Sequence, residues 1–156
     1  MRNITIRTFR VGLASVVVAL TALGGLAAMS MRPAEAAQNF VTFQSPTGNV
    51  HCLLYTEPGE THFATCELRE FSGKIPKRPA DCDLDWVPGA SVDARGRVSV
   101  FSCQGDTNQS PDNKKLSYGK SVKSGVFTCT SAVTGVTCKV KSGRGFLVSR
   151  SVIKAY

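Results

Sequence analysis

The six cysteines constrain the fold of this 156-residue chain more than any other feature, because all of them lie downstream of an export-type leader. The leader has basic residues near its start, an uncharged stretch from 11 to 29, and the small-residue tripeptide Ala34-Glu35-Ala36. This pattern is typical of a secretory signal peptide. Disulfides form and persist in the compartments that such a peptide leads to. The even cysteine count therefore predicts a disulfide framework.

We predict that residues 1–36 are a cleaved signal peptide and that residues 37–156 form a single disulfide-rich β domain. An uncleaved membrane anchor is the alternative, because the apolar stretch approaches the ~18–20 residues that span a bilayer. Its glycines and alanines make it weakly hydrophobic for an anchor, which favours cleavage and no stable membrane insertion afterwards. The expected location is periplasmic or secreted.

The net charge of the mature domain gives only a weak indication of its binding partners. The leader holds four of the 19 basic residues and one of the 11 acidic ones, so the net charge falls from +8 to +5 on cleavage. A positive charge favours anionic partners such as envelope lipids or acidic glycans. The basic residues are scattered, however, as on a surface that only keeps a protein soluble. We expect no specific nucleic acid partner.

Apolar residues of the mature chain alternate with the period of two that strands have, and no window shows the 3.6-residue stripe of a helix. Turns that contain glycine or proline separate the short β-forming runs. The expected strands are 40–43, 50–55, 62–68, 97–103, 126–131, 136–141 and 146–149. The fold class is therefore all-β, as a small disulfide-stapled antiparallel sandwich or barrel.

Two segments interrupt this pattern of strands. Residues 73–80 contain two prolines and three basic residues, so they are not expected in a central strand. Residues 105–115 consist of polar residues, glycine and proline, and we expect them on the surface, because a buried loop would leave its polar groups without partners. These two loops are where binding is expected.

The cysteines are expected to pair in chain order. Cys52 and Cys66 lie on the two arms of a predicted hairpin, and a register that pairs residue 55 with residue 63 places them opposite each other. Opposed strand residues lie ~4.5–5.5 Å apart at Cα, which a disulfide can bridge. The expected disulfides are Cys52–Cys66, Cys129–Cys138 and Cys82–Cys103, and other connectivities remain open from sequence.

No catalytic or metal-binding constellation is visible in the sequence. The two histidines, His51 and His62, are expected to be surface residues of a hairpin, and no motif indicates a nucleophile beside either. The chain has no Cys-x-x-Cys pair, so zinc is not expected. We expect no catalytic residue, no metal and no cofactor.

The densest polar cluster is the segment around Asp81, Asp83 and Asp85, which Trp86 follows. In an extended strand the three carboxylates would share one face, as a calcium site requires. The glycine and glutamate of a calcium-binding EF-hand loop are missing, and the alternative is a tight turn in which the carboxylates accept backbone N–H groups. Trp86 is a candidate for a binding surface, with core packing as the alternative.

Three further residues are weak candidates for binding. Asp106 lies in the polar loop, and Tyr118 shortly follows that loop. Arg144 lies between two glycines, where backbone amides and a guanidinium would hold an anion, unless the segment is simply a hairpin turn.

Several short motifs occur along the mature chain in a specific order. They are Phe43-x-Ser45-Pro46-x-Gly48-Asn49, Pro79-Ala80-Asp81-Cys82-Asp83-x-Asp85-Trp86, Cys103-x-Gly105-Asp106-Thr107, Leu116-x-Tyr118-Gly119, Gly135-Val136-Thr137-Cys138 and Gly143-x-Gly145-Phe146-x-Val148-Ser149-Arg150. Their order resembles a family of small exported bacterial proteins classed only as a domain of unknown function. The resemblance implies an exported, cysteine-rich domain and no particular reaction. The family pattern would have histidine where Arg144 stands.

The function expected from the sequence is a non-catalytic binding or interaction module. As a monomer it would bind a protein, an envelope component or a glycan through the two polar loops. An exposed aromatic surface around Trp86 and Tyr118 would favour this function. A protein inhibitor or envelope-stress factor is the alternative, because a disulfide-stapled scaffold presents a rigid loop at low entropic cost. A hydrolase is the less favoured third function, and it would require that mutation of His51 or His62 abolishes its activity.

Overall fold

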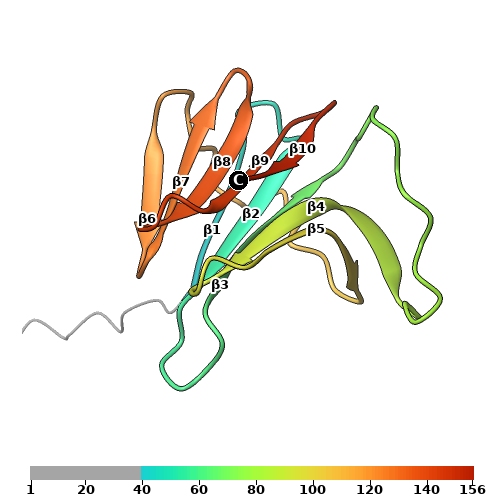
Figure 1. Cartoon of the computed structure of the whole chain (residues 1–156). Helices are drawn as coiled ribbons and strands as arrows, with labels where there is room; N and C mark the ends of the chain where they lie inside the picture. Colours follow the sequence, from blue (N-terminus) through green and yellow to red (C-terminus); the bar gives the residue numbers. More distant parts are fainter. Residues whose placement is uncertain (1–39) are drawn as a thin grey trace, which may run out of the picture. The chain divides into compact units, whose positions relative to one another are not determined.

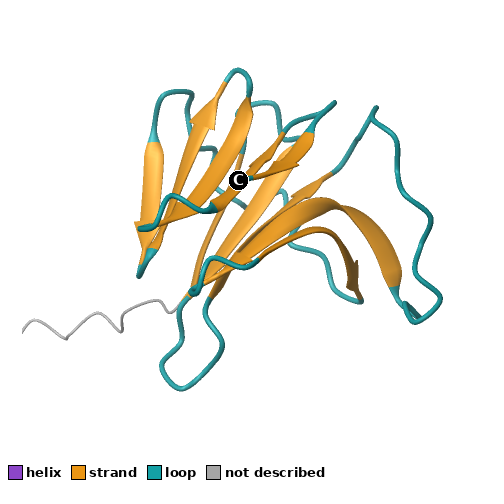
Figure 2. Cartoon of the chain, viewed as in Figure 1, coloured by secondary structure: helices purple, strands orange, loops and turns teal. Residues whose placement is uncertain are grey.

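The computed structural model describes residues 40–156, and the predicted signal peptide at 1–36 lies outside the described residues. Within 40–156 all regular secondary structure is β-strand (Figures 1 and 2). No helix in this range is long and apolar enough to cross a membrane. The strands are β1 (Phe40–Gln44), β2 (Val50–Tyr55), β3 (Phe63–Leu68), β4 (Asp85–Asp93), β5 (Val98–Gln104), β6 (Ser121–Ser124), β7 (Phe127–Ala132), β8 (Gly135–Val140), β9 (Gly145–Val148) and β10 (Ile153–Ala155).

The strands form two five-stranded antiparallel sheets, each of which follows the order of the chain. The first sheet runs β1-β2-β3-β4-β5 and the second runs β10-β9-β8-β7-β6. The sheets pack face to face, with β3, β4 and β5 against β8, β9 and β10 (Figure 1). The all-β expectation is confirmed, and the architecture is a sandwich with open edges rather than a barrel.

The inner faces of the two sheets form the hydrophobic core, to which Phe43, Leu54, Phe127 and Phe146 contribute large buried side chains. Alternation places these residues inward and their sequence neighbours outward. In the first sheet Cys52 is opposite Cys66, and in the second sheet Cys129 is opposite Cys138. Both pairs form disulfides and all four cysteines are fully buried.

The two core disulfides contact each other across the interface between the sheets. Cys66 Sγ lies 3.7 Å from Cys138 Sγ. The third disulfide joins Cys82 to Cys103 and fastens the proline-rich segment to β5. The pairing in chain order that we predicted is therefore the pairing present in the structure.

Strand β4 is not among the strands predicted from the sequence, and it contains Pro88 and Gly89, which are unusual within a strand. Both residues lie at a β-bulge, where the register of β4 against β5 shifts between Val87 and Ala90. A bulge tolerates the missing N–H of proline. At Gly89 a Cβ atom would collide with the backbone oxygen of Cys66, so β4 approaches β3 more closely there than a side chain would allow. Strands β6 and β10 are short and were also missed.

Candidate functional site

The polar loop after β5 is docked on the outer face of the first sheet by a buried carboxylate. Glu67 on β3 points outward, yet only 1% of its surface is exposed. Its Oε2 accepts a hydrogen bond from the Thr107 hydroxyl at 2.7 Å, and its Oε1 accepts from the Asn108 backbone N–H at 2.9 Å and from the Gln104 side-chain amide. Three donors from one segment thus satisfy the carboxylate, as a buried charge requires.

A second set of contacts fixes the same loop to β1 and β2. The Asn113 side-chain amide donates to the backbone oxygen of Asn108 at 2.9 Å and lies 3.3 Å from His51 Nδ1. The Gln44 side-chain amide donates to the Asn113 backbone oxygen. Leu116 N–H donates to the Gln44 backbone oxygen, which closes the loop against the edge strand. The loop therefore packs on the outer face of the sheet. We had expected its residues on the surface, but Asn113 is buried.

The expectation that His51 is a surface residue is also wrong. His51 is fully buried beneath the loop, and its Nε2 lies 3.0 Å from the Gly48 backbone oxygen. A carbonyl oxygen can only accept, so Nε2 carries the proton of the neutral ring and Nδ1 accepts from Asn113. Burial lowers the pKa of His51, and Arg69 adds to this effect, while the Gly48 hydrogen bond and Glu67 oppose it. The histidine is thus a neutral structural residue. His62 is partly exposed on the β2–β3 hairpin, as predicted.

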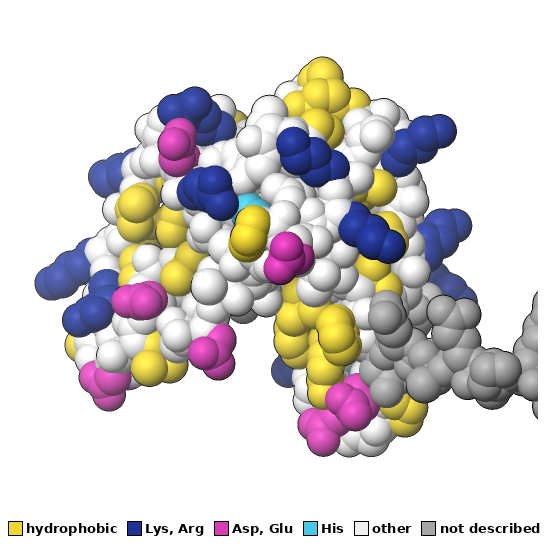
Figure 3. Space-filling view, turned by 180° about the vertical axis from the view of Figure 1, so that it is seen from behind, with side chains coloured by type: hydrophobic (Ala, Val, Ile, Leu, Met, Phe, Trp, Pro, Cys, Tyr) yellow, Lys and Arg dark blue, Asp and Glu magenta, His cyan; other side chains and the backbone are white. Residues whose placement is uncertain are grey.

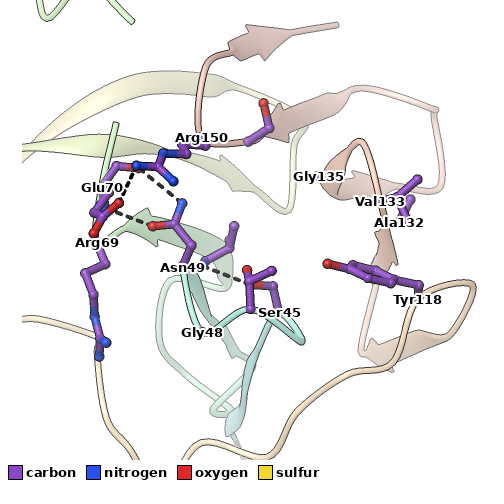
Figure 4. A pocket seen from close by; sticks show the side chains of 13 residues that line it. Ser45, Gly48, Asn49, Arg69, Glu70, Tyr118, Ala132, Val133, Gly135 and Arg150 are labelled. Carbon is purple, nitrogen blue, oxygen red and sulfur yellow. Dashed lines mark hydrogen bonds and ion pairs between the residues drawn. The ribbon is translucent and has the colours of Figure 1, made fainter. Parts of the chain in front are cut away.

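At one end of the sandwich, turns from both sheets surround a cleft of about 330 Å³ (Figure 4). This volume is at the lower end of the ~300–1,000 Å³ of small-ligand sites. Its lining comes from the β1–β2 turn, the end of β3, the turn before β6, the β7–β8 turn and the β9–β10 turn. The lining residues are Ser45, Thr47, Gly48, Asn49, Val50, Arg69, Glu70, Tyr118, Ala132, Val133, Gly135, Ser149 and Arg150.

One wall of the cleft is polar and carries a chain of hydrogen bonds. The Asn49 side chain donates to the Glu70 backbone oxygen at 3.1 Å and accepts from the Glu70 backbone N–H at 2.9 Å. The Glu70 carboxylate pairs with Arg150 Nη2 at 2.8 Å. The Arg150 backbone oxygen in turn accepts from the backbone N–H and the hydroxyl of Ser72. These contacts join the first sheet to the second, and the ion pair itself is solvent-exposed, with side-chain exposures of 71% for Arg150 and 60% for Glu70.

The opposite wall is apolar. Tyr118 and Val133 are 43% and 81% exposed, and Figure 4 shows the Tyr118 side chain pointing across the cleft toward Ser45, with Val133 on the same side as Tyr118. Tyr118 is the second residue of a four-residue turn that the Lys120 N–H closes onto the Ser117 backbone oxygen. Gly119 supplies the positive φ of +78° that the third position of such a turn requires. The cleft thus pairs a guanidinium with exposed apolar surface.

Of the residues singled out from the sequence, only Tyr118 lines this cleft. Asp81 and Asp83 are exposed in the loop before β4, Asp85 is exposed at the start of that strand, and Asp106 is exposed beside Glu67. Within 40–156 the three aspartates do not meet in a group that could hold a metal ion; the one such group is Cys52, Cys66 and Cys138, whose sulfurs are all in disulfides.

The two remaining candidates have structural contacts. Trp86 stacks on Phe101 with ring centroids 5.8 Å apart, and its Nε1 donates to the Pro76 backbone oxygen at 3.1 Å. Trp86 therefore packs beneath the proline-rich segment and does not share a surface with Tyr118. Arg144 Nε donates to the Gly96 backbone oxygen at 2.8 Å and so joins the β8–β9 turn to the β4–β5 turn.

The cleft residues that sequence reasoning missed are Asn49, Glu70 and Arg150. No periodicity marks them, because they lie in turns that are far apart in the chain. One signal did point to the cleft: four of the motifs that carry the family resemblance supply residues to it. These contributions are Ser45, Gly48 and Asn49 from the first motif, Tyr118 from the fourth, Gly135 from the fifth, and Ser149 and Arg150 from the last.

Comparison with known families finds one match. The model of a family described as a family of unknown function, DUF6636, matches residues 22–155. No curated protein and no solved structure matches the chain.

Proposed function

This chain belongs to the DUF6636 family of unknown function, and we propose that its domain is a non-catalytic binding module that holds an acidic segment of a partner protein in the cleft. The observation that carries the proposal is that Arg150, whose guanidinium is turned toward Glu70, lines the same cleft as the exposed Tyr118 and Val133. A guanidinium has five N–H donors in a planar fork that matches a carboxylate. The ion pair with Glu70 involves one of its nitrogen atoms.

The apolar wall defines the second part of the ligand. Tyr118, Ala132 and Val133 present a surface that a neighbouring aliphatic or aromatic side chain would cover. Aromatic residues and arginine are the side chains that dominate binding energy in protein interfaces. The net charge of +5 on the mature domain would bring an acidic partner toward the surface.

The lining also supports binding rather than catalysis. Within 40–156 neither histidine and none of the six cysteines lines the cleft. Its hydroxyl groups therefore have no imidazole base beside them, as serine nucleophiles require. The two hydrogen bonds that hold the Asn49 side chain favour a preformed polar wall, because an ordered group loses little entropy when a ligand binds.

The proposed location of this activity is the periplasm or the outside of the cell, with the domain acting as a monomer. Three disulfides in a domain of this size support an oxidising compartment, since thiols stay reduced in the cytosol.

A peptide-binding titration tests the proposal. The probes are peptides that place one or two acidic residues beside a leucine or phenylalanine, and they are titrated into the oxidised domain by calorimetry. We expect Arg150→Ala and Tyr118→Ala each to weaken binding about tenfold, which corresponds to about 1.4 kcal/mol. Raising the salt concentration should weaken binding further.

Lys154→Ala is the matched control, because it removes one positive charge from a residue that does not line the cleft. Equal losses for Arg150→Ala and Lys154→Ala would show that net charge alone attracts the peptide, and the cleft would then not be the site.

A further inference from the structure

The outer face of the first sheet carries three parallel rows of side chains that run across its strands. The row of Gln44, His51 and Glu67 is covered by the docked loop. The second row carries hydroxyl groups. It consists of Thr65 on β3, Ser91 on β4 and Ser99 on β5, which lie directly opposite one another in the strand register. Because alternate residues of a strand share one face, all three hydroxyl groups lie on the outer face.

The third row is aromatic. Phe40, Tyr55 and Phe63 lie opposite one another on β1, β2 and β3, and Asp93 on β4 follows them. The Tyr55 and Phe63 rings stack with centroids 5.4 Å apart, and Phe40 is 52% exposed at the edge of the sheet. The Tyr55 hydroxyl donates to the Glu57 carboxylate at 2.6 Å, which holds the ring in place.

Where the hydroxyl row meets the aromatic row, the sheet is hollowed into a groove of about 470 Å³. Viewed from behind, this side of the molecule is hollow between two lobes, and one of them carries hydrophobic side chains beside the hollow (Figure 3). The lining residues are Phe63, Thr65, Ser91, Asp93, Arg97, Ser99, Ser102 and Gln104. The curl of β5 beyond the bulge at Val87 and Ala90 brings Ser102 and Gln104 over the groove.

The chemistry of this lining is that of a site for an uncharged polar ligand. Its two charged side chains, Asp93 and Arg97, pair with each other at 2.6 Å. The Asp93 carboxylate also accepts from the backbone N–H groups of Arg95 and Arg97, so the carboxylate is held within the turn, while the Arg97 side chain is 75% exposed.

The Gln104 amide donates to Glu67 and accepts from the Ser102 hydroxyl, and the Thr65 hydroxyl donates to the Ala90 backbone oxygen. The hydroxyl groups of the lining that keep their donors for a ligand are therefore those of Ser91 and Ser99. The groove therefore offers hydrogen bonds without net charge, beside the Phe63 side chain.

We propose that this groove binds a neutral saccharide chain. A sugar ring has hydroxyl groups around its edge and C–H groups on its faces, so it matches a surface with hydroxyl partners beside aromatic rings. The aromatic row continues beyond the groove to Phe40, which gives room for more than one sugar unit. The positive side chain of the groove lining, Arg97, is paired through its Nε with Asp93, so the lining carries no net charge that would select an anionic polymer.

The site is separate from the cleft of the proposed function, because the two linings share no residue. A domain with both sites would hold a glycan with one surface and a protein segment with another. Each site is tested by variants that leave the other unchanged.

The test is a screen of the oxidised domain on immobilised neutral oligosaccharides, followed by calorimetry with the binders. We expect saturable binding to at least one β-linked or α-linked neutral glucan or chito-oligosaccharide. Tyr55→Ala should weaken it about tenfold through loss of the aromatic surface. Ser99→Trp should abolish it, because Ser99 is an exposed groove residue whose replacement fills the site.

Ser121→Trp is the matched control, since Ser121 is an exposed serine of a strand in the other sheet. Neither this variant nor Arg150→Ala should change saccharide binding. The absence of saturable binding to every neutral glycan in the screen would overturn the proposal, and so would binding that Ser99→Trp leaves unchanged. Binding confined to charged polymers, or to a peptide that pairs with the free edge of β5, would overturn it as well.

Discussion

Hairpins β2–β3 and β7–β8 are built on the same plan in the two sheets. Each has a fully buried disulfide between directly opposed residues, Cys52–Cys66 in one and Cys129–Cys138 in the other. In each sheet the next strand brings a glycine onto the backbone oxygen of the second cysteine, Gly89 over Cys66 and Gly145 over Cys138, where a Cβ atom would collide.

The hairpins differ in the outward pair next to each disulfide. In the first sheet this pair is His51 and Glu67, both buried under the docked loop. In the second sheet it is Thr128 and Lys139, and Lys139 is exposed, with its Nζ 4.9 Å from the centroid of the Tyr156 ring. One scaffold thus serves two purposes: the second sheet leaves its outer face to solvent, while the first uses buried polar groups to attach a loop and shape a groove.

Removing the core disulfides tests whether the two hairpins are equivalent inside the sandwich, and it has the largest expected effect. The loops that they close span 14 and 9 residues, so the chain-entropy model gives about 3 kcal/mol of stabilisation for each. We expect the double variants Cys52→Ala/Cys66→Ala and Cys129→Ala/Cys138→Ala to lose this amount, plus a cavity contribution. Urea unfolding measures both losses. Values that differ by more than about 2 kcal/mol would show that the hairpins are not equivalent.

Replacing the outward carboxylate tests the difference between the sheets. Glu67→Ala leaves three donors without their acceptor, one at the end of β5 and two in the docked loop, which should lower the free energy of unfolding by about 2–4 kcal/mol. Lys139→Ala, at the matching position of the second sheet, should lower it by less than about 1 kcal/mol, because only an exposed cation–π contact is lost. Equal effects in urea unfolding would contradict the contrast between a buried and an exposed outer face.

The inside of the sandwich was largely predictable from sequence. Alternation and turn residues indicated most strands, and the register that pairs Tyr55 with Phe63 is the one observed. That register brought Cys52 opposite Cys66, so the disulfide followed from local information. Strand β4 was missed because a bulge accommodates Pro88 and Gly89, and only the position of the neighbouring strand reveals this.

The surface features were not predictable, because they depend on residues far apart in the chain. The partners of Glu67 lie 37 to 41 residues away, and the partner of His51 Nδ1 lies 62 residues away. No periodicity links such positions, and a polar loop with buried partners looks the same in sequence as a solvated one. The cleft is likewise assembled from separate turns, of which only Tyr118 was a candidate.

Titration of His51 gives the smallest effect and tests the buried face most specifically. Burial lowers the pKa of His51 in the folded state, and protonation of Nδ1 would place an N–H against the Asn113 amide, whose orientation is fixed by its bond to the Asn108 oxygen. Below the unfolded pKa of about 6.5, the unfolded chain binds a proton that the folded ring resists. The contribution of His51 is therefore complete above this pH and is lost as the pH falls, by at most about 1.4 kcal/mol per unit.

The measurement compares the wild type with His51→Gln by urea unfolding between about pH 7.5 and pH 5.5. Glutamine can donate to the Gly48 oxygen and accept from Asn113, but it does not titrate. We expect the stability advantage of the wild type over His51→Gln to shrink as the pH falls, because only the wild type loses this contribution. Thr128→Gln, at the matching position of the second sheet, should give a difference from the wild type that does not change with pH. An advantage that stays constant for His51→Gln as well would show that the folded ring accepts a proton as readily as the unfolded one, and the first sheet would then not hold its histidine as a neutral, buried partner of the loop.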